Sequence, residues 1–171
     1  MKRLESETLS TDHANSFLIH YGFLKEGQTL KQVVKRDQEV LKILGYSTQE
    51  VADLLADICE TNCQENNFVY TALNRKRYKV VIERSRGIKR CPWQDFVNLK
   101  KSPSFINFYI NEVDKTERIR IPGLLRHLIE KHGFFEGGLY RVAPETIVEM
   151  FGIERIPGSI ELAKKLLLTD S

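Results

Sequence analysis

The amino-acid sequence predicts an α+β fold with N-terminal helices, a central antiparallel sheet of about four strands in two hairpins, and C-terminal helices. Apolar residues recur at helical spacing over residues 1–64, at alternate positions over 65–122, and at helical spacing again over 123–171. The chain has 171 residues, of which 42% are hydrophobic and 29% charged. This size and composition predict one globular domain, residues 1–171, whose core needs no disulfide or metal.

The N-terminal helices are marked by capping residues. A short helix follows Ser10–Asp12, and Gly22 ends it. Thr29–Gln32 (TLKQ) is a capping box that opens a second helix, which Gly45 closes, and Ser47–Glu50 (STQE) opens a third. The predicted buried stripes are Leu30, Val33, Val34, Val40, Leu41 and Leu44 in the second helix, and Val51, Leu54, Leu55 and Ile58 in the third.

Alternation of apolar and polar residues predicts the strands. Phe68–Leu73 and Arg77–Arg84 flank a polar NRK turn, and this pattern is typical of an antiparallel hairpin. Phe105–Asn111 and Arg118–Ile121 form the second hairpin. In this hairpin Ile106, Phe108 and Ile110 share one face, and the second strand places arginine outside and isoleucine inside. The segment between the hairpins is predicted to be a structured loop with a helical turn around residues 94–99.

Proline and glycine divide the C-terminal third. Pro122 is predicted to occupy the first position of a helix that Gly133 ends, with Phe134 folding back on the last turn. A short strand-like LYRV segment at 139–142 follows. Two further helices are then predicted, Pro144–Phe151 and Ser159–Leu168.

Positive charge is concentrated in the middle of the chain. Residues 75–101 contain ten Lys and Arg against two Asp and Glu, although the whole chain has a net charge of only +3. Cations interleaved with Tyr78, Trp93 and Phe96 favour binding of nucleic acid or another polyanion. The predicted binding residues are Arg75, Lys76, Arg77, Lys79, Arg84, Arg86, Lys89, Arg90, Trp93, Lys100 and Lys101.

Two other functions remain open from the sequence. The basic segment could instead dock on an acidic protein partner or on the acidic N-terminal helices of a second copy. A small enzyme with a pocket near His127, Tyr140 and Trp93 is the second alternative. The sequence lacks the phosphate-binding loop, the dinucleotide-binding glycine motif and the nucleophile elbow of common enzyme classes.

The histidine and cysteine pattern predicts no metal site and no cofactor. His127 and His132 are five residues apart, so their side chains should leave an ideal helix about 140° apart, unlike the ligands of H-E-x-x-H. His132 is expected to interact with the helix dipole. Cys59 and Cys63 could in principle complete a tetrahedral site with Cys91 and a distant histidine, but they are expected to pack in the core. A catalytic Cys91 would need a base and a lowered pKa, which the neighbouring Lys89 and Arg90 could favour.

The sequence favours a cytoplasmic location. Three cysteines do not make a disulfide framework, and reduced thiols are the simpler reading. The N-terminal residues lack the apolar stretch of a secretory signal, and no apolar run has the length of a membrane span. We therefore expect no membrane partner.

Overall fold

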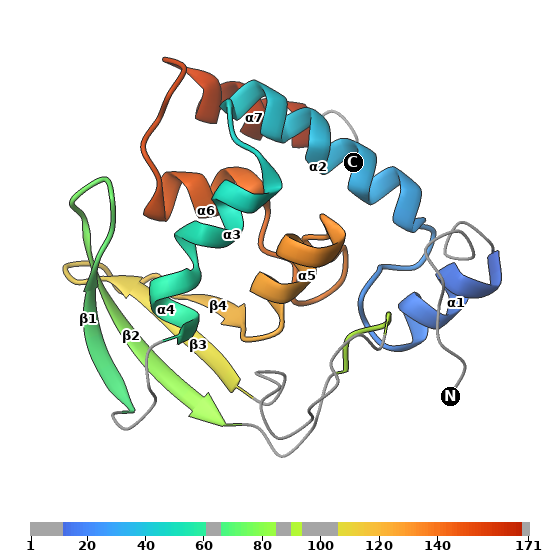
Figure 1. Ribbon diagram of the computed structural model, residues 1–171, viewed down its shortest axis with the longest axis horizontal. Coiled ribbons are helices and arrows are strands. Elements are labelled where there is room, and N and C mark those ends of the chain that lie inside the picture. The colour runs from blue at the N-terminus through green and yellow to red at the C-terminus, as the bar shows by residue number, and fades with distance from the viewer. Residues whose placement is uncertain (1–11, 61–65, 85–89, 94–105, 169–171) are drawn as a thin grey trace.

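The computed structural model describes residues 12–60, 66–84, 90–93 and 106–168 (Figure 1). The elements within these residues are α1 (Asp12–His20), α2 (Leu30–Leu44), α3 (Thr48–Leu54), α4 (Ala56–Glu60), β1 (Asn67–Thr71), β2 (Arg77–Arg84), β3 (Ile106–Glu112), β4 (Ile119–Pro122), α5 (Leu125–His132), α6 (Pro144–Phe151) and α7 (Ser159–Leu168). The predicted α+β class is confirmed: α1–α4 precede a four-stranded antiparallel sheet along the chain, and α5–α7 follow it.

Both predicted capping boxes form. The Gln32 amide N–H donates to Thr29 Oγ1 at 3.3 Å, and the Thr29 N–H donates to the Gln32 side chain at 3.1 Å. At the start of α3, the Ser47 N–H donates to the Glu50 carboxylate at 2.8 Å. Hydrogen bonds from the Ser47 backbone and hydroxyl lower the pKa of Glu50 to about 2. Gly45 ends α2 in the left-handed conformation, as predicted, with φ 71°.

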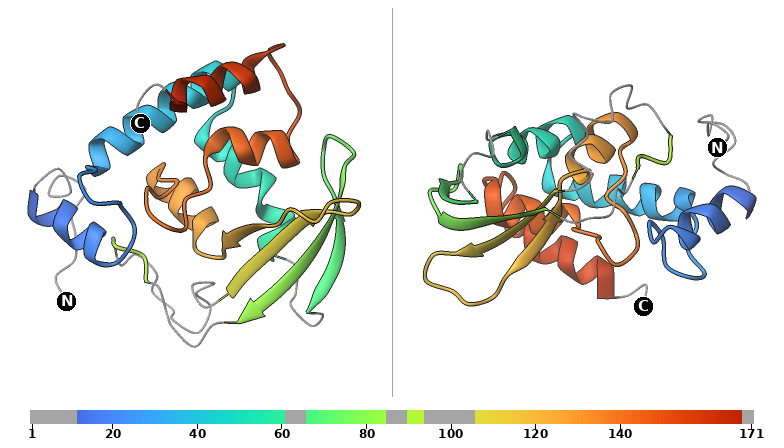
Figure 2. Two further views of the ribbon diagram at one scale, coloured as in Figure 1. Left: turned by 180° about the vertical axis from the view of Figure 1, so that it is seen from behind. Right: turned by 90° about the horizontal axis from the view of Figure 1, so that it is seen from below.

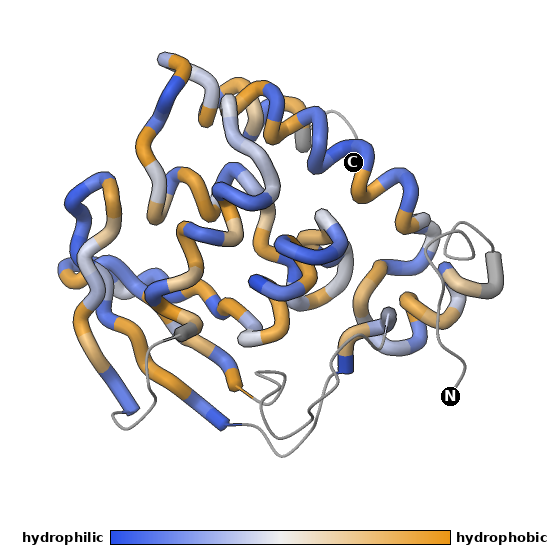
Figure 3. The backbone as a smooth tube through the Cα atoms, viewed as in Figure 1, coloured by the Kyte–Doolittle hydropathy of each residue, from blue (hydrophilic) through white to orange (hydrophobic). Residues whose placement is uncertain are grey.

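The longest helix, α2, has one hydrophobic side along its length (Figure 3). Its buried residues include the predicted Leu30, Val33, Val40, Leu41 and Leu44, and also Asp37. None of the described helices combines the length and the apolar composition that a membrane span requires.

The sheet is a meander in which each strand pairs with the next in sequence, in the order β1-β2-β3-β4. One face is covered by helices, and α4 lies in front of the strands in Figure 1. The sheet residues of the main core on this covered face are Tyr78, Val80, Ile82, Phe108, Ile110 and Ile121. The predicted inward set is confirmed at Phe108 and Ile110, which are fully buried.

Three local predictions are wrong. Pro122 is the last residue of β4, opposite Asn107, and α5 begins only at Leu125. Because β4 is an edge strand, the missing N–H of this proline removes no bond within the sheet. Residues 139–142 form a turn and loop instead of a strand. The third predicted helix is divided at Leu55 into α3 and α4, although its apolar stripe is buried as expected.

A second hydrophobic cluster lies away from the sheet, and viewed from below the strands and α1 lie on opposite sides of the molecule (Figure 2, right). It joins the end of α1 to α5 and the loop after α5. The Phe23 carbonyl accepts hydrogen bonds from the N–H groups of Gly137 at 2.7 Å and Gly138 at 3.0 Å. Cys91 is buried in this cluster, and Trp93 packs against it.

The contact at Gly138 predicts a stability effect. A Cβ at this position would lie 2.2 Å from the carbonyl oxygen of Gly22. Because that oxygen belongs to the backbone, no flexible side chain can move aside to relieve the clash. We expect Gly138→Ala to lower the free energy of unfolding by about 1–3 kcal/mol. Urea denaturation measures the change. The neighbouring Leu139, which is 88% exposed, is the control, and an equal loss in Leu139→Ala would contradict the steric explanation.

Candidate functional site

The second face of the sheet carries polar and charged side chains. Along β2 the residues alternate, so that Arg77, Lys79 and Glu83 are exposed while Tyr78, Val80 and Ile82 are buried. Val69 of β1 is opposite Lys79 and is 54% exposed. If a helix covered this side of the sheet, Val69 would be buried. Its exposure therefore shows that this face is open to solvent here.

Strands β3 and β4 add an aromatic ring and two guanidinium groups to this face. Tyr109 is opposite Val81 of β2 and Arg120 of β4. The Arg118 guanidinium carbon lies 4.6 Å from the centre of the Tyr109 ring, and that of Arg120 lies 6.0 Å from it. Arg118, which directly precedes β4, is therefore on the same side as Tyr109.

Arg120 is held in place by two further contacts. Its Nε and Nη2 atoms donate to Asn107 Oδ1 at 3.0 and 2.8 Å. Its guanidinium carbon also lies 4.3 Å from the centre of the Tyr140 ring. Because Asn107 and Tyr140 already hold the Arg120 side chain, it loses little conformational freedom when it binds a ligand.

We call this surface the outer sheet face and define it by Arg77, Lys79 and Arg118, which are exposed, and by Tyr109 and Arg120, which are half-buried. The acidic residue that alternates with these cations on β2 is Glu83, so the face carries an excess of positive charge. Two of these cations, Arg118 and Arg120, lie next to the Tyr109 ring. This arrangement can bind a phosphate chain and stack against a planar group.

The structure places the eleven residues of the predicted basic site in separate parts of the molecule, and some lie outside its described residues. Arg75 and Lys76 are exposed in the β1–β2 turn, and Arg77 and Lys79 belong to the outer sheet face. Arg84, at the end of β2, donates to Asn66 Oδ1 at 3.1 Å. Arg90 is exposed in the short segment 90–93, which lies beside α1 and far from the hairpin (Figure 1). The predicted binding residues outside the described part of the chain are Arg86, Lys89, Lys100 and Lys101.

Trp93 does not join the cations of the hairpin. Its ring stacks on the His132 imidazole, with centroids 4.0 Å apart and planes 8° from parallel. It also meets Phe134 edge to face at 5.9 Å. One face of the indole is therefore occupied by His132 and is not available for stacking on a base.

Three residues of the outer sheet face were missed by the sequence prediction, namely Tyr109, Arg118 and Arg120. A signal for them was present, because Tyr109 alternates with the buried Phe108 and Ile110, and the RIRI pattern already predicted arginine outside. The prediction considered charge along the sequence. A comparison of residues on neighbouring strands, instead of residues consecutive in the sequence, would have placed these three residues on the same face as Lys79.

A cluster of Cys91, His127 and His132 forms where segment 90–93 meets α5. One possible ligand atom from each residue lies within 4.8 Å of the other two. Cys91 Sγ is 3.5 Å from His132 Nε2, and the two imidazole centroids are 5.4 Å apart. The expectation that a spacing of five keeps the two imidazoles apart is therefore wrong.

The geometry at the end of α5 explains this error. His132 is the last residue of α5, and Gly133 follows in the left-handed conformation with φ 60°. Side chains of a helix lean toward its N-terminus, so the ring of His132 reaches back over the turn that carries His127. The angle between Cα–Cβ directions does not fix the distance between ring nitrogens at the ends of such side chains.

The predicted pocket near His127, Tyr140 and Trp93 is only partly assembled. His127 and Trp93 both contact His132, whereas Tyr140 lies against Arg120 beside the sheet. Two hollows elsewhere on the described surface, of about 390 and 370 Å³, are lined by other residues.

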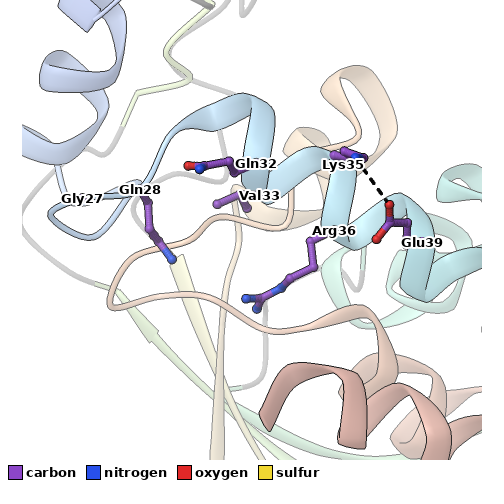
Figure 4. Close-up of a pocket in the computed structure, with 7 residues that line it drawn as sticks. All are labelled: Gly27, Gln28, Gln32, Val33, Lys35, Arg36 and Glu39. Carbon is purple, nitrogen blue, oxygen red and sulfur yellow. Dashed lines mark ion pairs between the residues drawn. The ribbon is translucent and has the colours of Figure 1, made fainter. Parts of the chain in front are cut away.

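The first hollow lies along α2 and is lined by Gln28 and Arg36 among others (Figure 4). Asp37, which follows Arg36 in the sequence, is fully buried and forms a bidentate ion pair with Arg141. Burial raises the pKa of Asp37 and of Glu145, and the nearby charge of Arg36 opposes both shifts. The charged residues lining this hollow are Lys35, Arg36 and Glu39; Lys35 pairs with Glu39 at 3.9 Å, which leaves Arg36 as one cation beside two buried carboxyls.

The second hollow lies at the end of the sheet, where the lining includes Lys76, Arg118 and Thr146. Its ionisable lining is balanced, with three cations and three acids. Lys115 and Glu112 of this lining form an ion pair at 2.8 Å. The outer sheet face is therefore the better candidate for binding an anionic ligand.

No protein-family model matches the chain, and no curated protein or solved structure matches it.

Proposed function

We propose that the protein binds single-stranded nucleic acid on the outer sheet face. The observation that carries this proposal is the Tyr109 ring with Arg118 at 4.6 Å and Arg120 at 6.0 Å, on an exposed surface that Arg77 and Lys79 extend. A sheet face that no helix covers, with a central aromatic residue, suits bases that are not paired within a duplex. The rigid edges of a duplex would meet little of this surface.

Each type of side chain has a separate role in this binding. The four cations neutralise phosphates and release counterions, which supplies affinity without reading the base sequence. The Tyr109 ring stacks on a base, and the stacking tolerates many sequences because every base has a π-face. Binding should therefore tolerate many sequences and weaken strongly with salt.

The salt dependence of binding is the first test. Engagement of all four cations should give a slope of about −3 for log affinity against log salt, at about −0.7 per phosphate of a single strand. Lys79→Ala/Arg118→Ala removes two of these cations, both from exposed positions, and should reduce the slope to about half. Fluorescence anisotropy of a labelled oligonucleotide, titrated at several salt concentrations, measures both values.

The matched control is Lys42→Ala/Lys165→Ala, which removes two exposed lysines from α2 and α7. This control should retain the slope of the original protein. Equal weakening in both double variants would mean that net charge, and not the outer sheet face, determines binding. Absence of any binding at tens of micromolar protein and about 50 mM salt would refute the proposal, since non-specific binding should be measurable there. Sedimentation that shows salt-sensitive self-association instead would favour a protein-interaction module.

A further inference from the structure

We propose that Cys91, His127 and His132 bind zinc or a similar divalent metal ion. This proposal does not depend on the function proposed for the outer sheet face. The three residues bring one thiol and two imidazoles together at the junction of segment 90–93 and α5. Thiolate and imidazole are the ligands that zinc takes most often in proteins.

The distances suit tetrahedral coordination. With Zn–S at about 2.3 Å and Zn–N at about 2.0–2.1 Å, neighbouring donor atoms of a tetrahedron are about 3.3–3.6 Å apart. The separation of 3.5 Å between Cys91 Sγ and His132 Nε2 already has this length. All three donor atoms lie within 4.8 Å of one another, so a shift of about 1 Å in side chains completes the set.

The spacing of the histidines supports the same reading. His127 and His132 form an H-x₄-H pair on a helix, and structural zinc sites use histidines separated by three to five residues in this way. The comparison with H-E-x-x-H in catalytic zinc enzymes concerned a different ligand arrangement. Three protein ligands leave one position for water or another donor.

The surroundings of the cluster would hold its ligands in place. Cys91 is only 3% exposed, and the parallel Trp93 ring at 4.0 Å fixes the plane of the His132 imidazole. Metal sites regularly contain groups that orient a ligand ring, most often through hydrogen bonds, and here the stacked indole restricts the ring. The hydrogen bond between Cys91 and His132 involves two of the three residues, and the metal would use His127 as its third ligand.

The position of the cluster in the fold indicates what the metal would do. Cys91 belongs to the connection between β2 and β3, whereas both histidines belong to α5. A bound ion would fasten this connection to α5 and to the second hydrophobic cluster, which contains Cys91, Leu124 and Leu128. Metal binding of this kind contributes directly to folding stability.

Cobalt binding tests the proposal on the full chain. Protein stripped with a chelator should bind one equivalent of Co²⁺, with a thiolate-to-cobalt charge-transfer band and the visible bands of a four-coordinate ion, and Zn²⁺ should displace it. Trp93 is the single tryptophan and stacks on a ligand, so its emission should change at the same equivalence point. Cys91→Ser should remove the charge-transfer band. His127→Gln should weaken binding by more than the about 10–100-fold that loss of an outer-shell partner costs.

Cys59→Ser and His20→Gln are the matched controls, because each removes one possible ligand elsewhere in the chain and should leave the titration unchanged. Circular dichroism shows whether each variant remains folded. If Cys91→Ser does not fold, His127→Gln still tests the site, because it changes only a half-buried side chain. The proposal is overturned if the unaltered protein gives no cobalt spectrum. It is also overturned if the charge-transfer band persists in folded Cys91→Ser, or if binding by folded His127→Gln equals that of the unaltered protein.

Discussion

Arg141→Ala should lower the free energy of unfolding by about 3–5 kcal/mol, the usual cost of removing one partner of a buried ion pair. Asp37 is fully buried, and the Arg141 side chain is 14% exposed. Arg141 Nη1 donates to Asp37 Oδ2 at 3.0 Å and to the Glu136 carbonyl at 2.6 Å. The alanine variant would leave a carboxylate in the interior without its main partner, and chemical denaturation measures the loss.

The same variant should have a characteristic pH dependence. Burial raises the pKa of Asp37, and Arg141 opposes this rise, so removal of Arg141 raises the pKa further. A carboxyl with a raised pKa binds more protons in the folded state than in the unfolded state, so its contribution to stability falls as pH rises. The deficit of Arg141→Ala should therefore be smallest near about pH 4 and should grow toward about pH 7.

Lys35→Ala is the control for this pair, since Lys35 is on the same helix as Asp37 and its ion pair with Glu39 is exposed (Figure 4). Exposed pairs of this type contribute less than about 0.5 kcal/mol. The double variant Asp37→Leu/Arg141→Met should recover most of the stability, because apolar residues of similar size remove the need for pairing. A deficit for Arg141→Ala that does not depend on pH would contradict the role given to Asp37.

The second large effect is the difference in stability loss between alanine substitutions at two adjacent residues of β3. Phe108 is fully buried against the helices, whereas Tyr109 is on the outer sheet face. Phe108→Ala should cost about 3–5 kcal/mol of unfolding free energy, since it leaves a cavity in the main core. Tyr109→Ala should cost about 1 kcal/mol or less, mainly through loss of its contact with Arg118.

Binding should respond to the same pair of substitutions in the opposite way. Tyr109→Ala should weaken oligonucleotide binding by about 1–3 kcal/mol if its ring stacks on one base. Folded Phe108→Ala, studied at low temperature, should bind nearly as well as the unaltered protein. If Tyr109→Ala retains full affinity, stacking on this ring is refuted, and the cations alone would account for binding. If it destabilises as strongly as Phe108→Ala, the face is not exposed.

Local features of the fold followed directly from the sequence. Both capping boxes and the left-handed Gly45 and Gly133 are in their predicted places, because each depends on contacts within one helical turn. The change to strands near Phe68 was equally clear, since a period of two reflects a half-buried strand. Pro122 was misassigned because its fixed φ suits both a helix start and an edge strand, and only the position of β4 in the sheet distinguishes them.

One buried charge also left a trace in the sequence that was not used. Asp37 falls within the apolar stripe of α2, between Val33 and Val40, where a solvated aspartate would not be expected. This position indicates a buried partner. It does not identify that partner, because Arg141 is 104 residues away in the chain.

The sequence by itself determined the α+β class, most of the element boundaries and the excess of positive charge in residues 75–101, because periodicity, capping and composition are local properties. Only the tertiary structure decided which of these residues meet. The register of β2, β3 and β4 placed Arg118, Arg120 and Tyr109 on the same face of the sheet as Lys79. The packing of segment 90–93 against α5 brought Cys91 to His132 and moved Trp93 away from the hairpin. Such contacts depend on how distant elements pack, and the spacing of residues along one element does not specify that packing.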